Sequence, residues 1–344
     1  MEKFVSRNPA IDWLKGVGIV CIVVYHVSVG VIPRGYLGVE LFFMISGFFL
    51  MESWLYRPTT TVRYTWSRIK RYAIPYILTL VGACLTRFDL LFHFKDLDSF
   101  LEGYTRLFQI FTMSQAMGAQ AGCEQFFIGS WFIGELILVG GLLYGMLEFN
   151  HKLSVYVLFP CLVFVSYNLL YNEFDGNKWT VIWGLPYEFY RALCCMALGA
   201  LISYCHNTYA EAFSRRAKFI NCMGVLALSL YLCILFSRGS YDKYVFILLP
   251  WILAATIINE SVLKKCLTKL GRGILTILGK YSLYLLLAHG PVLTGVKFLF
   301  GRAGVSAQGL CYTVTVYTSI IVFTVALYFC SRKVELLLKR YEFK

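Results

Sequence analysis

Residues 11–26 read IDWLKGVGIVCIVVYH, and this stretch decides the kind of fold to expect. It is apolar or small between Lys15 and a lone histidine, His26. Eleven residues make three helical turns plus about 20°, so the two side chains share one helix face, roughly 16 Å apart. A histidine in hydrocarbon is costly and is therefore a candidate functional residue. The alternative is a histidine satisfied by a hydrogen bond to another helix.

The composition predicts a membrane protein. Hydrophobic residues make up 58% of the 344 residues and charged residues only 15%, too few for the surface of a soluble protein of this size. We predict an all-α polytopic membrane bundle of about ten transmembrane helices, with residues 1–344 as a single membrane-embedded domain. The first apolar run does not resemble a removable signal peptide. The predicted spans are 11–32, 36–56, 69–90, 131–149, 152–171, 185–205, 218–237, 243–259, 273–299 and 309–333.

The basic residues predict the orientation. The net charge is +13, and most of the 32 Lys and Arg fall on the side of the N-terminus. The positive-inside rule then places both termini in the cytoplasm. Nucleic-acid binding is a poor explanation of this charge, because we expect no soluble basic domain. The twelve cysteines lie mostly inside predicted spans without metal-ligand spacing, so we expect packing residues and no metal site.

Residues 91–130 form the longest predicted connection, on the exoplasmic side. Its apolar residues recur at i, i+3, i+4 and i+7, which predicts an amphipathic helix at the membrane interface. The helix could cover a site that opens outward, or it could merely pack on the bundle. Its apolar residues are Leu97, Phe100, Leu101, Tyr104, Leu107, Phe108 and Phe111.

Counting residues from the span ends places several ionisable side chains in the outer half of the membrane. His26 and Glu40 lie on successive spans with a short link, so we expect them to face each other at similar depth. Glu188 and Arg191 are three residues apart on one helix face and could form a structural ion pair. Together these groups suggest a polar cavity open to the outside. The expected members are His26, Glu40, Glu135, Glu188, Arg191 and His289.

The inner side is basic instead. Lys15 lies near the base of the first span, and Arg68 and Arg71 lie near the start of the third. These side chains could bind phosphate groups from the cytoplasm. They could also serve only to orient the protein in the membrane.

Four stretches in order resemble the membrane acyltransferase type 3 family, which has ten core transmembrane helices. Their order and spacing across nearly the whole chain carry the resemblance, and residues 130–132, SWF, add a weaker element. The four are residues 11–16, IDWLKG, running to His26; 38–48, GVELFFMISGF; 67–75, SRIKRYAIP; and 278–285, LGKYSLYL, ending at His289.

The resemblance implies transfer of an acyl group, commonly acetyl from acetyl-CoA, to a hydroxyl of a cell-surface polysaccharide or its lipid-linked precursor. It implies a multi-pass protein of the bacterial inner membrane, with His26 as the catalytic histidine and Lys15, Arg68 and Arg71 as donor-binding residues. Tyr284 joins the cavity candidates. Lys15 stands where the family usually has arginine, which removes bidentate binding there. Glu40 stands where aspartate is frequent. We expect no hydrolase-like domain after the last span.

These expectations leave mechanisms and rival functions open. His26 could act as general base, oriented by Glu40, or it could form an acyl-histidine intermediate. Ser46 is a possible nucleophile, although Ser46-Gly47 is more simply a close helix contact. A proton-coupled transporter of a small acid or lipid-linked sugar is the main rival, and a non-catalytic subunit of a glycan-assembly complex is another. No bound cofactor is expected beside the acyl-CoA co-substrate, and the sequence is silent on oligomeric state.

Overall fold

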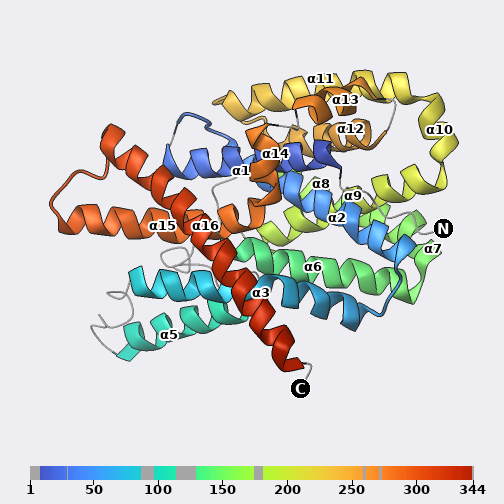
Figure 1. The fold of residues 1–344 in the computed structure, drawn as a ribbon. Coiled ribbons are helices and arrows are strands. Elements are labelled where there is room, and N and C mark those ends of the chain that lie inside the picture. The colour runs from blue at the N-terminus through green and yellow to red at the C-terminus, as the bar shows by residue number, and fades with distance from the viewer. Residues whose placement is uncertain are drawn as a thin grey trace. The chain divides into compact units, whose positions relative to one another are not determined.

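The computed structural model describes residues 8–28, 30–86, 97–113, 129–173, 181–258, 261–270 and 273–342, and most of these residues are helical (Figure 1). Among them, eight helices are long and apolar enough to cross a membrane. The predicted all-α polytopic membrane fold is therefore confirmed. The eight are α1 (Pro9–Val27), η1 with α2 (Gly35–Leu37, Gly38–Tyr56), α6 (Ser130–Phe149), α7–η4–α8 (His151–Leu153, Ser154–Leu158, Phe159–Glu173), α9 (Tyr187–Thr208), α11 (Ala217–Phe236), α15 (Ser282–Arg302) and α16 (Gly309–Glu342).

Two predicted spans have broken helices as counterparts. The span predicted at 243–259 begins with η5 (Asp242–Tyr244) and α12 (Val245–Ile257), and the chain then bends by 78° into α13 (Val262–Leu270). The prediction of one continuous helix over 273–299 is wrong. The chain there forms α14 (Ile274–Lys280) and then α15, with a break at Tyr281.

The third predicted span is the helix α3 (Thr61–Thr86). It is not among the eight, because its first turns carry Arg63, Arg68, Lys70 and Arg71. Its remaining residues, 72–86, are largely apolar. A shorter helix, α10 (Ala210–Arg215), links α9 to α11.

The chain divides into two compact units, each built from two segments. Unit 1 comprises Met1–Thr65 and Leu138–Ser282, and unit 2 comprises Trp66–Ile137 and Leu283–Lys344. The prediction that residues 1–344 act as one domain stays a prediction.

In unit 1, α2 and α9 run parallel and interlock through two glycines. A Cβ on Gly47 would stand 1.9 Å from the carbonyl oxygen of Met196, and one on Gly199 would stand 2.0 Å from that of Met44. Only glycine permits such an approach of two backbones. The predicted close helix contact at Ser46-Gly47 is confirmed, and the Ser46 hydroxyl donates to the carbonyl of Phe42 at 2.8 Å.

The helix α1 packs between α2 and α14, again through glycine. A Cβ on Gly16 would stand 1.9 Å from the carbonyl oxygen of Leu275, and one on Gly279 would stand 1.7 Å from that of Asp12. On the other side, Gly38 of α2 lies against the carbonyl of Gly18. Two of the stretches quoted above, 11–16 and 278–285, thus meet at backbone contact distance.

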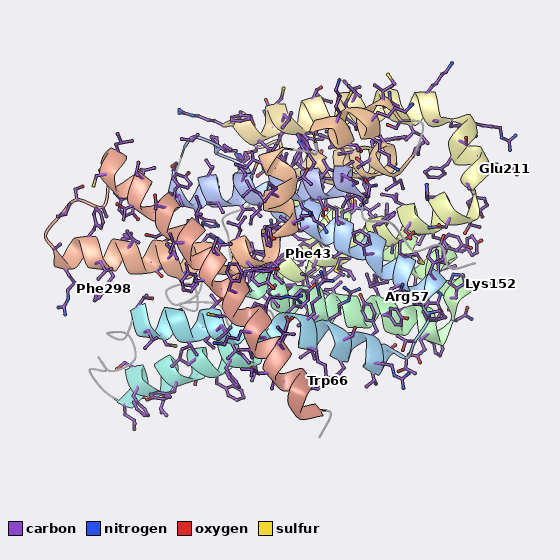
Figure 2. All side chains as sticks on the ribbon, viewed as in Figure 1. Phe43, Arg57, Trp66, Lys152, Glu211 and Phe298 are labelled. Atoms are coloured by element: carbon purple, nitrogen blue, oxygen red, sulfur yellow. The ribbon has the colours of Figure 1, made fainter. Side chains whose placement is uncertain are left out.

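The side chains of unit 1 differ in their burial. Phe43 is fully buried within the helices, whereas Arg57, Lys152 and Glu211 lie on the surface (Figure 2). Ahead of α9, strands β1 (Val181–Ile182) and β2 (Leu185–Pro186) form a small antiparallel hairpin. Its second turn residue, Gly184, has φ +78°, a value that favours glycine.

Unit 2 contains α5 (Leu97–Thr112), α15, α16, most of α3 and the start of α6. The hydroxyl of Tyr76 on α3 donates to the carbonyl of Ile110 on α5 at 2.7 Å, and Ile110 is fully buried. The helix predicted within 91–130 is therefore present, while residues 91–96 and 114–128 lie outside the described part of the chain. Six of its seven predicted apolar residues are exposed, namely Leu97, Phe100, Leu101, Tyr104, Phe108 and Phe111.

Candidate functional site

Several segments of unit 1 meet at one end, which we call the His26 end. It comprises the last turn of α1, the link between α1 and α2, which ends in η1, the first turns of α2 and α9, and η5. The link is fixed to α11, because the backbone N–H of Arg34 donates to the carbonyl of Leu235 at 3.1 Å. The hydroxyl of Tyr231 donates to the carbonyl of Leu37 at 3.2 Å. In the described part of unit 1, four of the six buried charged residues lie at this end, namely Glu40, Glu188, Arg191 and Asp242.

Glu40 and Arg191 form a buried ion pair at this end. Arg191 Nε donates to Glu40 Oε1 at 2.6 Å, and Nη2 of the same guanidinium contacts the same oxygen. Glu40 is fully buried and Arg191 is 4% exposed. Glu188 and Tyr187, one helical turn before Arg191, are also buried and lie within electrostatic reach of it. The expected meeting of Glu40, Glu188 and Arg191 is therefore found, with Glu40 as the direct partner of Arg191.

His26 lies in the last turn of α1 and is partly exposed. Its ring meets that of Tyr25 edge to face, with centroids 5.0 Å apart. The imidazole is thus held against an aromatic ring and is partly exposed.

The structure corrects the predicted pairing of His26 with Glu40. Gly18, not His26, lies level with the start of α2, and His26 is eight residues, about 12 Å, further along α1. Glu40 is also about 200° round α2 from Gly38, which faces α1. The carboxylate of Glu40 therefore points to α9 and binds Arg191, and the idea that it orients the imidazole is not supported.

A second polar group at the His26 end was not predicted. Asp242 of η5 is 3% exposed, and its Oδ2 accepts from Arg34 Nη1 at 2.8 Å and from the hydroxyl of Tyr36. Arg34 also donates to Tyr36 Oη at 2.8 Å and to the carbonyl of Gly239 at 2.9 Å. Arg34 and Asp242 are 208 residues apart, so only their opposite charges, in two loops expected on the same side, could have suggested the pair.

Lys15 lies further down α1, toward the other end of unit 1. Its ammonium group stands over the ring of Phe49, 5.2 Å from the centroid. A cation over an aromatic face gains electrostatic stabilisation. At this other end, Glu52 Oε1 accepts from Ser203 Oγ at 2.9 Å and from Asn207 Nδ2 at 2.6 Å.

The other predicted residues belong to unit 2. His289 is 1% exposed, and its Nδ1 lies 2.6 Å from the carbonyl oxygen of Leu286. A Cβ on Gly129, whose φ is +81°, would stand 3.5 Å from the His289 ring. The motif at 130–132 therefore begins beside His289. Glu135, in the second turn of α6, is fully buried.

The donor-binding candidates of unit 2 lie on α3. Arg68 is partly exposed and Arg71 is exposed. Arg71 lies within electrostatic reach of Tyr284, whose ring meets that of Tyr328 edge to face at 5.4 Å. Unit 1 thus holds Lys15, His26, Glu40, Glu188 and Arg191, and unit 2 holds Arg68, Arg71, Glu135, Tyr284 and His289.

The comparisons with known proteins give the class of this membrane protein, the integral membrane acyltransferases. The match to a family model for an acyltransferase domain covers residues 8–330, so the chain belongs to the membrane acyltransferase type 3 family. No solved structure is significantly similar to it.

Among curated proteins, the chain is similar to the O-acetyltransferase OatA of Staphylococcus aureus, from strains NCTC 8325 / PS 47, COL and MRSA252. Each is 34% identical over 98 residues, which is 27% of this chain and 16% of the relative. The matched stretch therefore spans about a sixth of the relatives' length.

Proposed function

We propose that this protein transfers an acyl group, acetyl from acetyl-CoA, to a sugar hydroxyl of a cell-surface polysaccharide or of its lipid-linked precursor. Family membership supports acyl transfer, and the printed activity of the Staphylococcus relatives supports O-acetylation. The observation that carries the proposal is the place of His26. It is a partly exposed histidine at the end of a membrane-spanning helix, on the same face as Lys15.

The donor enters from the cytoplasm in this proposal, and the acceptor arrives from the other side of a bacterial inner membrane. The excess of Lys and Arg near the N-terminal side supports the orientation with both termini inside. In unit 1, Lys15 is the candidate for binding the phosphates of CoA, as cations bind phosphate elsewhere. In unit 2, Arg68 and Arg71 are candidates for the same role. The thioester then extends along α1 toward His26, over roughly 16 Å of helix.

The chemistry at His26 is general base catalysis. The neutral imidazole takes the proton of the acceptor hydroxyl while that oxygen attacks the thioester carbonyl carbon. The new C–O bond forms, the C–S bond breaks, and the imidazolium returns the proton to the departing thiolate of CoA. A two-step route through an acyl-histidine would leave label on His26 when acceptor is withheld.

The Glu40–Arg191 pair has a different part in this proposal. It joins the first turns of α2 and α9 and so fixes one wall of the His26 end. Glu188, in the same cluster, remains a candidate for contact with the acceptor. In unit 2, Glu135, Tyr284 and His289 remain candidates as well. The proposed partners are the acyl-CoA donor, the glycan acceptor and membrane lipid.

The test is transfer of radiolabelled acetyl from acetyl-CoA to envelope material. Membranes with wild-type protein are compared with membranes holding equal amounts of His26→Ala. His206→Ala is the matched control, because it removes a histidine from the last turn of α9 in the same unit. We expect label with wild type and His206→Ala and none with His26→Ala.

Other outcomes would contradict the proposal in distinct ways. Equal label with His26→Ala would remove His26 from the chemistry. Absence of label with all three proteins, combined with uptake of a small acid into proteoliposomes in the absence of any acyl donor, would favour a proton-coupled transporter. No binding of acetyl-CoA by the wild-type protein would favour a non-catalytic subunit.

A further inference from the structure

The link between α1 and α2 is fastened by a buried polar group with no part in the chemistry above. Arg34, Tyr36 and Asp242 bond to one another, and Arg34 also reaches the carbonyl of Gly239. Tyr36 is 8% exposed and Asp242 is 3% exposed. Burying a carboxylate is costly even beside a guanidinium, here that of Arg34, whose side chain is 17% exposed, so such a group calls for an explanation beyond closure of a loop.

Aromatic contacts connect this group to His26. Tyr36 meets the ring of Tyr25 edge to face, with centroids 5.1 Å apart. Tyr25 in turn meets the imidazole of His26 edge to face at 5.0 Å. The sequence of contacts is therefore Asp242 to Tyr36 by hydrogen bond, Tyr36 to Tyr25 by ring edge, and Tyr25 to His26 by ring edge.

The backbone leaves this chain of contacts little room to shift. A Cβ on Gly35 would stand 2.2 Å from the carbonyl oxygen of Cys21 and 2.9 Å from Cβ of Tyr25. The η1 turn thus lies directly against the last turns of α1. The absence of a side chain on Gly35 therefore lets η1, which carries Tyr36, pack against the turn of α1 that carries Tyr25.

We propose that Arg34, Tyr36 and Asp242 form a positioning cluster that holds the ring of Tyr25 against the imidazole of His26. The inference rests on the proposed function, in which His26 is the general base. General base catalysis requires the imidazole within hydrogen-bond reach of the acceptor hydroxyl. The cluster is made of residues that position and do not touch substrate, so its loss should lower kcat and spare donor binding.

The test uses full-length protein in proteoliposomes and four variants. Tyr25→Leu removes the intermediate ring, and Asp242→Asn removes the carboxylate that holds Tyr36. Tyr25→Phe keeps the ring and is the conservative rescue. Tyr231→Phe is the matched control, because it deletes another phenolic hydroxyl that holds the same link, through Leu37, without ring contact to Tyr25.

Two readouts are taken. The first is kcat and KM for acetyl-CoA. The second is the rate at which diethyl pyrocarbonate modifies His26, followed by mass spectrometry, which does not depend on activity. We expect Tyr25→Leu and Asp242→Asn to lower kcat by about tenfold or more, since small misplacements of catalytic groups have effects of this size. Their KM should stay within about twofold and the modification rate of His26 should change. Tyr25→Phe and Tyr231→Phe should match wild type in all three values.

Two results would overturn the inference. Wild-type kcat and wild-type modification of His26 in both Tyr25→Leu and Asp242→Asn would show that the cluster does not position the histidine. An equal loss in Tyr231→Phe would show that the cluster merely fastens the link. If wild type transfers no acetyl, the proposed function fails, and the modification rates alone decide whether the cluster positions His26.

Discussion

The ion pair between Glu40 and Arg191 gives the sharpest prediction about stability. Both side chains are almost fully buried, and Arg191 Nε lies 2.6 Å from Glu40 Oε1. Removing one partner of a buried pair leaves an uncompensated charge and costs about 3–5 kcal/mol. Arg191→Met should lie at the upper end of this range, because it leaves the carboxylates of Glu40 and Glu188 together. Glu40→Met should cost less, because Glu188 remains near Arg191.

A double-mutant cycle measures the interaction itself. In Glu40→Met with Arg191→Met, both charges are gone and apolar groups of similar length replace them. The double variant should be more stable than Arg191→Met alone, with a coupling energy of about 2 kcal/mol or more. The assay is unfolding in mixed detergent micelles with increasing SDS, followed by circular dichroism. Losses that add to within about 0.5 kcal/mol would refute the pair as a stabilising contact.

Three further predictions concern a helix contact, a hydrogen bond and contact with lipid. Gly279→Val should destabilise the protein by about 3 kcal/mol, because its Cβ would stand 1.7 Å from the Asp12 carbonyl oxygen. The control is Gly301→Ala, whose Cβ would have nothing within 4 Å. It should not destabilise the protein in the same unfolding assay. Tyr76→Phe removes the bond to Ile110, worth about 1 kcal/mol, so amide exchange in α5 should quicken about fivefold; unchanged exchange would contradict this. A bilayer-soluble carbene reagent should label Phe108, and absence of label would show that the exposed stripe of α5 does not contact lipid.

The sequence predicted the helices well because hydrocarbon leaves few alternatives for an apolar chain of this kind. The same reasoning placed Glu40 beside His26 wrongly. Counting from span ends estimates depth but does not give the face of a helix, and Gly38 turns Glu40 away from α1. The break at Tyr281 also escaped prediction, because residues 279–282, GKYS, form only a short interruption between two apolar stretches.

Other features of the fold and the site depend on contacts between segments that are far apart in the sequence. The motif glycine Gly279 has a physical reason only once α14 lies on α1. Arg34 and Asp242 could not be paired from sequence, since nothing local marks loops 208 residues apart as neighbours. The amphipathic pattern of α5, by contrast, is a local property, and the structure confirms it at Leu97–Thr112.

The central claim is that His26 performs the acyl transfer. The most direct measurement is the initial rate of radiolabelled acetyl transfer from acetyl-CoA to lipid-linked glycan in proteoliposomes, with purified wild type, His26→Ala and His206→Ala at equal amounts. The account predicts equal rates for wild type and His206→Ala and a rate at background for His26→Ala. A His26→Ala protein that transfers acetyl at the wild-type rate would contradict it.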